Sequence, residues 1–191
     1  QIKKKISAKA QIHGSYIVGE NQEGFYLIDQ HAAKERVNYE YYKRKFARFD
    51  ATYQDLLVPL VFELPMSEYL IIQEKKDLLL EVGIELIEFG QNSFIVKKLP
   101  IWMHQINEKK YIDDMIEQIL REDKVDRMVL QDHAIATLSC KASLKANTYL
   151  TLNDMQAIID DLMRCDNPYV CPHGRPTVIF YSSYELEKLF K

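Results

Sequence analysis

The chain has 191 residues, of which 47% are hydrophobic and 28% are charged, with 25 basic against 28 acidic side chains. This length and apolar content are enough to bury a core, either as one domain or as two small lobes. The near balance of charge excludes an overall positive field, so any contact with DNA must be local or helped by a partner.

The sequence carries no sign of export or of a membrane anchor. Its apolar runs fall well short of the ~20 residues that a membrane helix needs, and no signal-peptide pattern precedes the three cysteines. An odd number of widely spread cysteines favours thiols in a reducing, intracellular setting. Because the chain opens at Gln1 on a lysine-rich run, we expect it to be a piece of a longer protein.

The first fifty residues predict a hairpin followed by a helix. Residues 13–20 and 25–29 have the pattern of two strands joined by a turn. Residues 30–49 contain no Gly or Pro and favour a helix, which Asp29 can cap from the end of the strand before it.

The middle of the chain predicts a small unit of helices and a hairpin. Two prolines indicate an extended connector over residues 52–65. A helix over residues 67–82, closed by Gly83, and a hairpin of residues 84–89 and 93–99 follow.

Apolar residues at helical spacing predict most of the remainder. The expected helices cover residues 111–122, 129–146, 153–163 with Asn153 as the cap, and 184–190. Residues 177–181 are predicted to form a buried strand, and the proline-rich run before them a loop.

The junction at Asp29 carries the first candidate for chemistry. On a helix, His31 and Glu35 are separated by about 40° around the axis, so both can reach one metal ion. Asp29 can point into the same space. Carboxylates with an imidazole suit zinc or manganese, which can activate water near neutral pH. Taken alone, the pair also fits a solvated ion pair on a charged helix.

The second candidate is the loop Cys171-Pro172-His173-Gly174-Arg175-Pro176. A thiolate and an imidazole one residue apart in a rigid loop can bind one ion, although a buried thiol beside a loop histidine is the plain alternative. Arg175 could hold a phosphate in its planar fork or form a salt bridge.

Each of the remaining polar candidates, considered alone, can be explained by a structural role. Cys140 in a predicted helix fits a buried structural thiol, and so does Cys165. Glu40 is nine residues beyond His31, on nearly the opposite side of the helix, where an ion pair with Arg36 or Arg44 is favoured.

One further segment has the composition of a docking peptide. Gln54-Asp55-Leu56-Leu57-Val58-Pro59 joins a polar anchor to aliphatic residues and a proline, as a peptide in the apolar groove of a partner would need. A core strand ending at a proline is the local alternative.

Together these segments resemble one family. Asp29-Gln30-His31-Ala32, followed by Glu35 and Glu40, resembles the endonuclease motif of MutL-type DNA mismatch-repair proteins. Residues 139–143, Ser-Cys-Lys-Ala-Ser, and the Cys171 loop resemble a second and a third block of the same family. Three blocks in the family's order span nearly the whole chain, so coincidence explains them poorly.

The resemblance implies a metal cluster. Its ligands would be His31, Glu35, Cys140, Cys171 and His173. Asp29, His31 and Glu35 would be the catalytic residues, while Gln30, Arg36, Glu40 and Arg175 would support them. Zinc would have a structural or regulatory role, and manganese would support nicking. The clamp-binding residues would be Gln54, Leu57, Val58 and Pro59, which match the family's motif for the replication sliding clamp.

The same resemblance implies an α+β fold of two lobes and a set of partners. Residues 1–56 and 129–191 would form a dimerisation lobe that holds the endonuclease site, and residues 57–128 an inserted regulatory lobe. The expected partners are a second copy, the clamp, double-stranded DNA and, through the longer parent, a mismatch-recognition protein; no membrane contact is expected. The family's ATPase region has no counterpart here, since no nucleotide-binding glycine loop occurs. The expected location is the bacterial cytoplasm, at the nucleoid.

Two other functions use residues of these types. A zinc-stabilised dimerisation and clamp-binding scaffold without catalysis would use the same residues. A zinc nucleobase deaminase needs His-x-Glu and Cys-x-x-Cys, whereas this chain has His-Ala-Ala-Lys-Glu and Cys-Pro-His, so we reject it.

Overall fold

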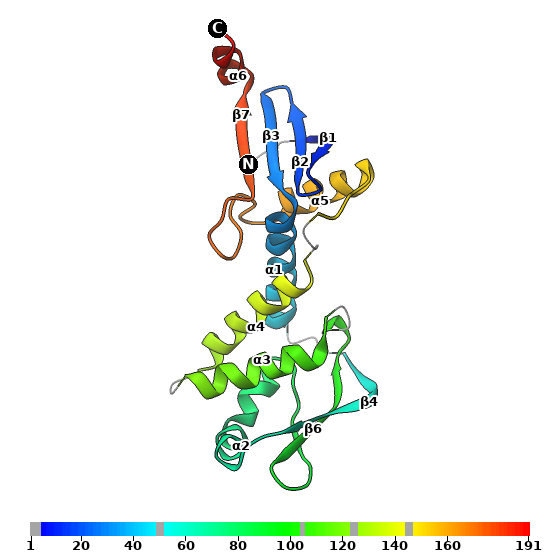
Figure 1. The fold of residues 1–191 in the computed structure, drawn as a ribbon, viewed down its shortest axis with the longest axis vertical. Coiled ribbons are helices and arrows are strands. Elements are labelled where there is room, and N and C mark those ends of the chain that lie inside the picture. Colours follow the sequence, from blue (N-terminus) through cyan, green and yellow to red (C-terminus); the bar gives the residue numbers. More distant parts are fainter. Residues whose placement is uncertain (1–4, 49–51, 104–105, 123–125, 144–146) are drawn as a thin grey trace. The chain divides into compact units, whose positions relative to one another are not determined.

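The computed structural model describes residues 5–48, 52–103, 106–122, 126–143 and 147–191 (Figure 1). It is a mixed helix and sheet structure, which confirms the predicted α+β class. The chain forms two compact units, one made of Gln1–Tyr41 and Ala142–Lys191 and the other of Tyr42–Lys141. These limits differ from the predicted lobe boundaries at residues 56 and 129, and the roles of the two lobes stay predictions.

The first unit is built on a four-stranded antiparallel sheet. Its strands are β1 (Ser7–Ile12), β2 (Tyr16–Asn21), β3 (Gly24–Asp29) and β7 (Val178–Ser182), in the order β1-β2-β3-β7. The predicted hairpin is the β2–β3 pair. Strand β1 escaped prediction because its only buried side chain is Ala8, so the sequence shows no alternation of apolar and polar residues.

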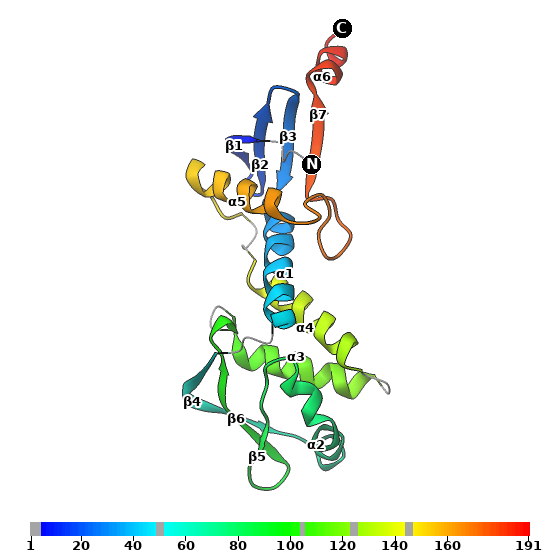
Figure 2. The ribbon, with the colours of Figure 1, turned by 180° about the vertical axis from the view of Figure 1, so that it is seen from behind.

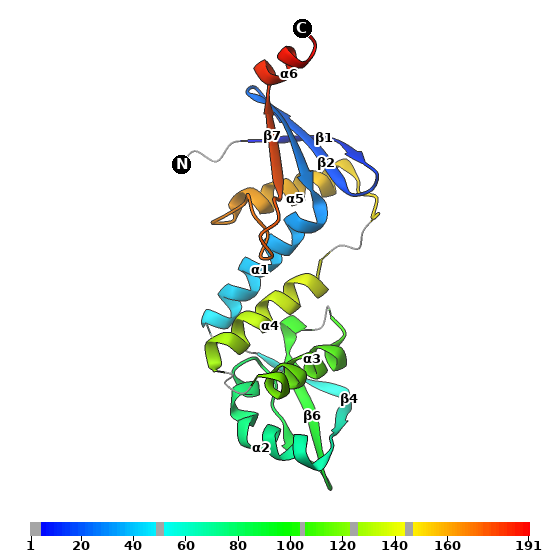
Figure 3. The same cartoon turned by 60° about the vertical axis from the view of Figure 1, so that its left-hand side comes forward.

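Helix α5 (Leu152–Arg164) packs on one face of this sheet (Figure 3). Its buried stripe of Met155, Ile158, Ile159 and Leu162 meets Ile17 and Ile28 of the strands. The cap is Thr151 and not the predicted Asn153, because Thr151 and Asp154 form a capping box in which each accepts the other's backbone N–H.

Strand β7 lies at the edge of the sheet beside β3 (Figure 2), followed by helix α6 (Ser183–Leu189). The prediction that this strand is buried was wrong: Ile179, Phe180 and Tyr181 are 39–46% exposed. Apolar residues in a strand predict that the strand is buried. Because β7 is an edge strand, part of its apolar surface is not covered by other residues of the same chain.

The second unit has a three-stranded sheet of order β4-β6-β5, formed by β4 (Tyr53–Glu63), β5 (Ile87–Glu88) and β6 (Ser93–Pro100). Helices α2 (Met66–Leu80), α3 (Glu108–Arg121) and α4 (Arg127–Lys141) and the short 3-10 turn Ile101–Met103 complete it. The predicted connector of residues 52–65 is thus largely a strand. Residues 144–146, where the last of these helices was expected to end, lie outside the described residues.

Helix α1 (Gln30–Arg48) follows β3 directly and runs from the first unit into the second. Its predicted last residue, Phe49, lies outside the described residues. Among the helices in the described ranges, none is both long and apolar enough to cross a membrane.

Candidate metal site

The site begins where β3 becomes α1. Asp29 ends the strand, and its Oδ1 accepts the backbone N–H groups of His31 at 2.9 Å and of Ala32 at 3.0 Å. Two orphan donors of the first turn are thereby satisfied, and a negative charge lies at the positive end of the helix dipole. The predicted capping role of Asp29 is confirmed, and it orients the helical turns that carry the next two candidates.

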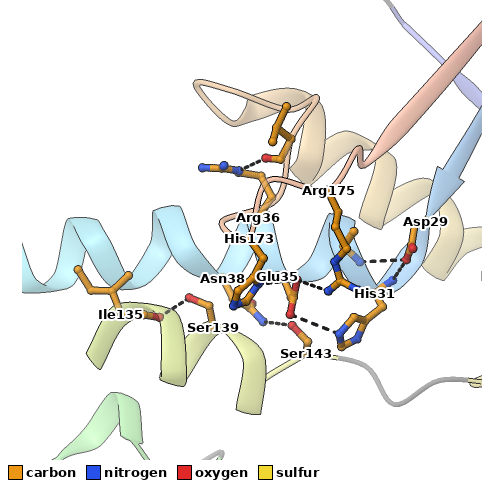
Figure 4. Close-up of polar contacts among 12 residues, drawn as sticks. Asp29, His31, Glu35, Arg36, Asn38, Ile135, Ser139, Ser143, His173 and Arg175 are labelled. Atoms are coloured by element: carbon orange, nitrogen blue, oxygen red, sulfur yellow. Dashed lines mark hydrogen bonds and ion pairs between the residues drawn. The ribbon is translucent and has the colours of Figure 1, made fainter. Parts of the chain in front are cut away.

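Glu35 is the buried centre of the site (Figure 4). Its side chain is 1% exposed, and its two oxygens face different neighbours. Oε1 lies 3.3 Å from His31 Nε2, while Oε2 lies 3.4 Å from both His173 Nδ1 and Arg175 Nη2. These contacts are long for charge-assisted hydrogen bonds. A buried carboxylate held only at this distance is suited to a closer cation.

The loop that carries Cys171 and His173 is closed on itself by backbone hydrogen bonds. Cys171 N donates to Arg175 O at 2.8 Å, and Gly174 N donates to Cys171 O at 3.0 Å. Gly174 has φ +81°, a conformation that glycine adopts without strain. The turn places Cys171, His173 and Arg175 near Glu35, although 136 or more residues separate them from it in the sequence.

Three predicted ligands come together. One donor atom each of Glu35, Cys171 and His173 lies within 4.8 Å of the others. In a tetrahedral zinc site, bonds of about 2.0–2.3 Å place neighbouring ligand atoms roughly 3.5 Å apart, so a modest contraction would let the three atoms bind one ion. A thiolate, an imidazole and a carboxylate form a donor set that fits zinc.

The other two predicted ligands are placed differently. His31 lies against Oε1 of Glu35, on the other oxygen from His173. Cys140 is an exposed residue of α4 and belongs to the second unit. Its membership of the ligand set stays a prediction. Cys165 is 7% exposed, and its Sγ lies 3.6 Å from Asp161 O, within the last turn of its own helix.

Two residues of α1 tie the Cys171 loop to the helix. Arg36 Nε donates to Val170 O at 2.6 Å, immediately before Cys171. The carboxylate of Glu40, itself 6% exposed, accepts the backbone N–H of Asp166 at 2.9 and 3.0 Å and that of Asn167 at 3.3 Å. Sequence spacing could not reveal these roles, because the partners are backbone groups about 130 residues away.

Gln30 secures the other side of the junction. Its buried amide donates to Gly14 O at 2.5 Å and to Thr148 O at 3.1 Å, while its oxygen accepts from Gln11 at 2.6 Å. The side chain therefore links the β1–β2 turn to the segment before α5. The position between Asp29 and His31 needs an amide for packing and hydrogen bonding in the first unit.

A pocket of about 270 Å³ adjoins Asp29 and Arg175. Its lining residues are Tyr16, Leu27, Asp29, Arg175, Pro176, Thr177 and Ile179. The register pairs Asp29 with Tyr16 and Leu27 with Ile179, so one end is polar and the other apolar. Tyr16 and Thr177 were not predicted to line a site, because the only feature that could have indicated this was their position at strand ends.

Arg175 is the positive charge at this cluster. A side-chain hydrogen bond with Cys171, followed by attraction to Glu35, holds the pKa of Arg175 above its ordinary value. Its side chain is 61% exposed. The guanidinium thus contacts the carboxylate of Glu35 while remaining accessible to solvent.

A buried carboxylate and a buried thiol, together with an exposed imidazole, lie near a strand–helix junction and define this chain as a candidate metal-binding protein of mixed helix and sheet. Residues 9–150 match the family model described as the MutL C terminal dimerisation domain. The chain belongs to this family.

Curated relatives agree with that assignment. The chain is 46% identical over 181 residues, 95% of its length, to the DNA mismatch repair protein MutL of Bacillus cytotoxicus, of which it covers 28%. It is 45% identical over 187 residues, 98% of its length, to the protein of the same name from Listeria welshimeri, of which it covers 31%. The chain therefore spans less than a third of the length of these relatives.

The role of Glu40 can be tested by its removal. Glu40→Ala leaves the backbone N–H groups of Asp166 and Asn167 without their acceptor, so we expect a loss of about 2 kcal/mol in the free energy of unfolding. A loosened loop should also lower zinc affinity roughly 10- to 100-fold. Urea unfolding and competition with a chromophoric chelator measure the two effects. Glu20→Ala, which removes an exposed carboxylate of β2, is the matched control. Wild-type stability and zinc affinity in Glu40→Ala would contradict the assigned role.

Proposed function

We propose that this chain is the metal-dependent endonuclease region of a mismatch-repair protein, and that it nicks the DNA strand to be repaired with help from the sliding clamp. The observation that carries the proposal is the convergence of Glu35, Cys171 and His173 beside Asp29. The relatives' name, DNA mismatch repair protein, supplies the process. Double-stranded DNA is the substrate, and a mismatch-recognition protein acts through the longer parent.

The donor set supports zinc at Cys171, His173 and Oε2 of Glu35. The other carboxylate oxygen faces His31, and an oxygen with an imidazole suits manganese. Divalent ions held here would activate water near neutral pH and offset charge on the phosphoryl oxygens. Glu35 is the residue that both ligand groups would share, since each of its oxygens faces a different histidine.

Asp29 is the candidate for the proton transfer. Its Oδ1 is held by two backbone N–H groups, which keeps the carboxylate at the start of the helix that carries His31 and Glu35. A carboxylate oriented in this way can accept a proton from attacking water, a role that contributes about 10²- to 10⁴-fold to the rate of such reactions.

Asp29→Asn separates this chemistry from capping, because Asn is as good an N-cap as Asp. We expect the variant to keep its stability within about 0.5 kcal/mol and to nick supercoiled plasmid at least roughly 100-fold more slowly in manganese. Asp160→Asn, which removes a carboxylate of α5 that accepts from Gln156, controls for the loss of charge. Nicking by Asp29→Asn at the wild-type rate would remove Asp29 from the chemistry and leave it a capping residue.

The clamp-binding segment has the exposure that docking requires. In β4 the pairing with β6 shifts between Asp55 and Leu60, so the residues between them leave the ladder. Leu57 and Val58 are then 103% and 75% exposed. Exposed aliphatic side chains on a protruding edge segment suit an apolar groove on a partner. The predicted alternative of a core strand is therefore not supported at these two positions.

Replacing Gln54 and Leu57 by Ala should remove clamp-stimulated nicking while basal nicking and thermal stability stay at wild-type levels. Loss of a groove-filling anchor lowers affinity roughly tenfold or more, which surface plasmon resonance on immobilised clamp can measure. Met128→Ala removes an apolar side chain of the second unit that is 72% exposed, and serves as the control. Undiminished clamp binding by the double variant would refute this part of the proposal.

A second copy of the chain is the proposed partner of β7 and α6. Apart from Ile179, which lines the pocket at Asp29, the exposed apolar residues of this region are Phe180, Tyr181, Tyr184, Leu189 and Phe190. Helix α6 has no buried residue. Such a contiguous apolar segment marks an interaction surface, and the family to which the chain belongs is named for dimerisation.

The charged variant Leu189→Glu tests this surface. Leu189 is 73% exposed, so the substitution leaves the core intact, whereas a carboxylate buried in an interface would be strongly unfavourable. We expect sedimentation velocity to show the wild type as a dimer and the variant shifted to monomer. Leu152→Glu, at a 54% exposed position of α5, should remain dimeric. A variant that dimerises like the wild type would place the interface elsewhere.

The second candidate function is a zinc-stabilised scaffold without catalysis. It is favoured by one observation, the buried thiol of Cys171, since a thiolate ligand is typical of structural zinc. On that reading, chelation would lower the unfolding temperature sharply, and no divalent ion would restore plasmid nicking to the stripped protein.

A further inference from the structure

The positive charge of Arg175 contacts the atoms that a metal ion would need. Arg175 Nη2 lies 3.4 Å from Glu35 Oε2. Glu35 belongs to the cluster whose donor atoms lie within 4.8 Å of one another. Arg175 therefore supplies positive charge to a carboxylate that is only 1% exposed.

A divalent cation bound at Glu35 Oε2 would repel this guanidinium, because two positive charges at close range are unfavourable. Since the Arg175 side chain is 61% exposed, it can move away from the carboxylate when an ion binds.

The displaced side chain has a place to go. Arg175 is 61% exposed and lines the pocket whose polar end is formed by Asp29 and Thr177. The other end is apolar, with Leu27 and Ile179. A guanidinium fork beside an apolar wall suits a phosphodiester, because the fork binds the phosphate oxygens and the wall can meet a deoxyribose.

We propose that Arg175 exchanges between two partners: it balances the charge of Glu35 until a metal ion binds there, and it binds a backbone phosphate of DNA once the ion has displaced it. This inference rests on the proposed function for its substrate. Metal binding then prepares the site for DNA in two ways, by providing the ion and by releasing a phosphate-binding residue. The chain would thereby avoid holding DNA tightly at a site that cannot cut it.

Arg175→Gln tests the exchange without disturbing the turn, because the Cys171 N–H donates to the backbone oxygen of residue 175, which the substitution keeps. Zinc alone is the first probe. With its competitor gone, the variant should bind zinc about tenfold more tightly, the size expected for one nearby charge at a partly exposed site, in competition with a chromophoric chelator. Arg164→Gln removes an arginine of α5 that is 73% exposed, and should bind zinc like the wild type.

A short DNA duplex is the second probe, measured by fluorescence anisotropy with and without zinc. In the wild type, zinc should raise DNA affinity. In Arg175→Gln this gain should fall roughly tenfold, and the salt slope of the zinc-loaded form should decrease by about one. The Arg164→Gln control should keep the wild-type gain.

The two proposals fail in different ways. If the wild type binds neither zinc nor manganese and does not nick, the proposed function is overturned. If the wild type binds zinc and nicks, but Arg175→Gln binds zinc no more tightly or keeps the full zinc-dependent gain in DNA affinity, the exchange of Arg175 alone is overturned.

Discussion

The burial of the Glu35 carboxylate is the constraint on which the rest of the site depends. A charge that is 1% exposed is costly unless positive groups or a metal ion compensate it. Here the positive charge comes from Arg175 on a distant loop, while His31 and His173 also face the carboxylate, all at 3.3–3.4 Å. None of these contacts is close enough to be a strong ion pair. The arrangement holds the carboxylate ready for a cation that could approach it more closely.

These contacts with Glu35 require that the Cys171 loop and helix α1 keep their positions relative to each other. Hydrogen bonds from α1 to the backbone of the loop hold them in place. Arg36 and Glu40 each bind main-chain groups of the segment before Cys171. Charged groups that hydrogen-bond to backbone are among the stronger non-covalent anchors. The stretch from residue 29 to residue 40 therefore combines ligands with the residues that position the other ligands, which explains why its acidic and basic residues are spread around the helix and do not follow one stripe.

Local signals were enough to predict much of the fold and part of the site. The β2–β3 hairpin, the start of α1 at Asp29 and the apolar stripe of α5 follow from turn residues, capping and periodicity within a few positions. Structural features that depend on residues far away in the sequence were not predicted. Strand β1 is defined by its neighbour β2, the exposure of β7 depends on what lies across from it, and the backbone partners of Glu40 lie more than 120 residues away. The cap at Thr151 could have been predicted locally, from Asp154 three residues later, but Asn153 was assigned as the cap instead.

The candidate site is thus divided between a rigid part and an attached part. Asp29, His31 and Glu35 share one helical end, where backbone geometry and the cap on Asp29 set their spacing. Cys171, His173 and Arg175 lie on a turn that is closed by its own backbone hydrogen bonds and tied to α1 through Arg36. Rotation of the side chains on this turn would let them approach an ion without disturbing the helix. The helix would then decide where the chemistry occurs, and the turn would decide whether metal or Arg175 occupies the carboxylate at its centre.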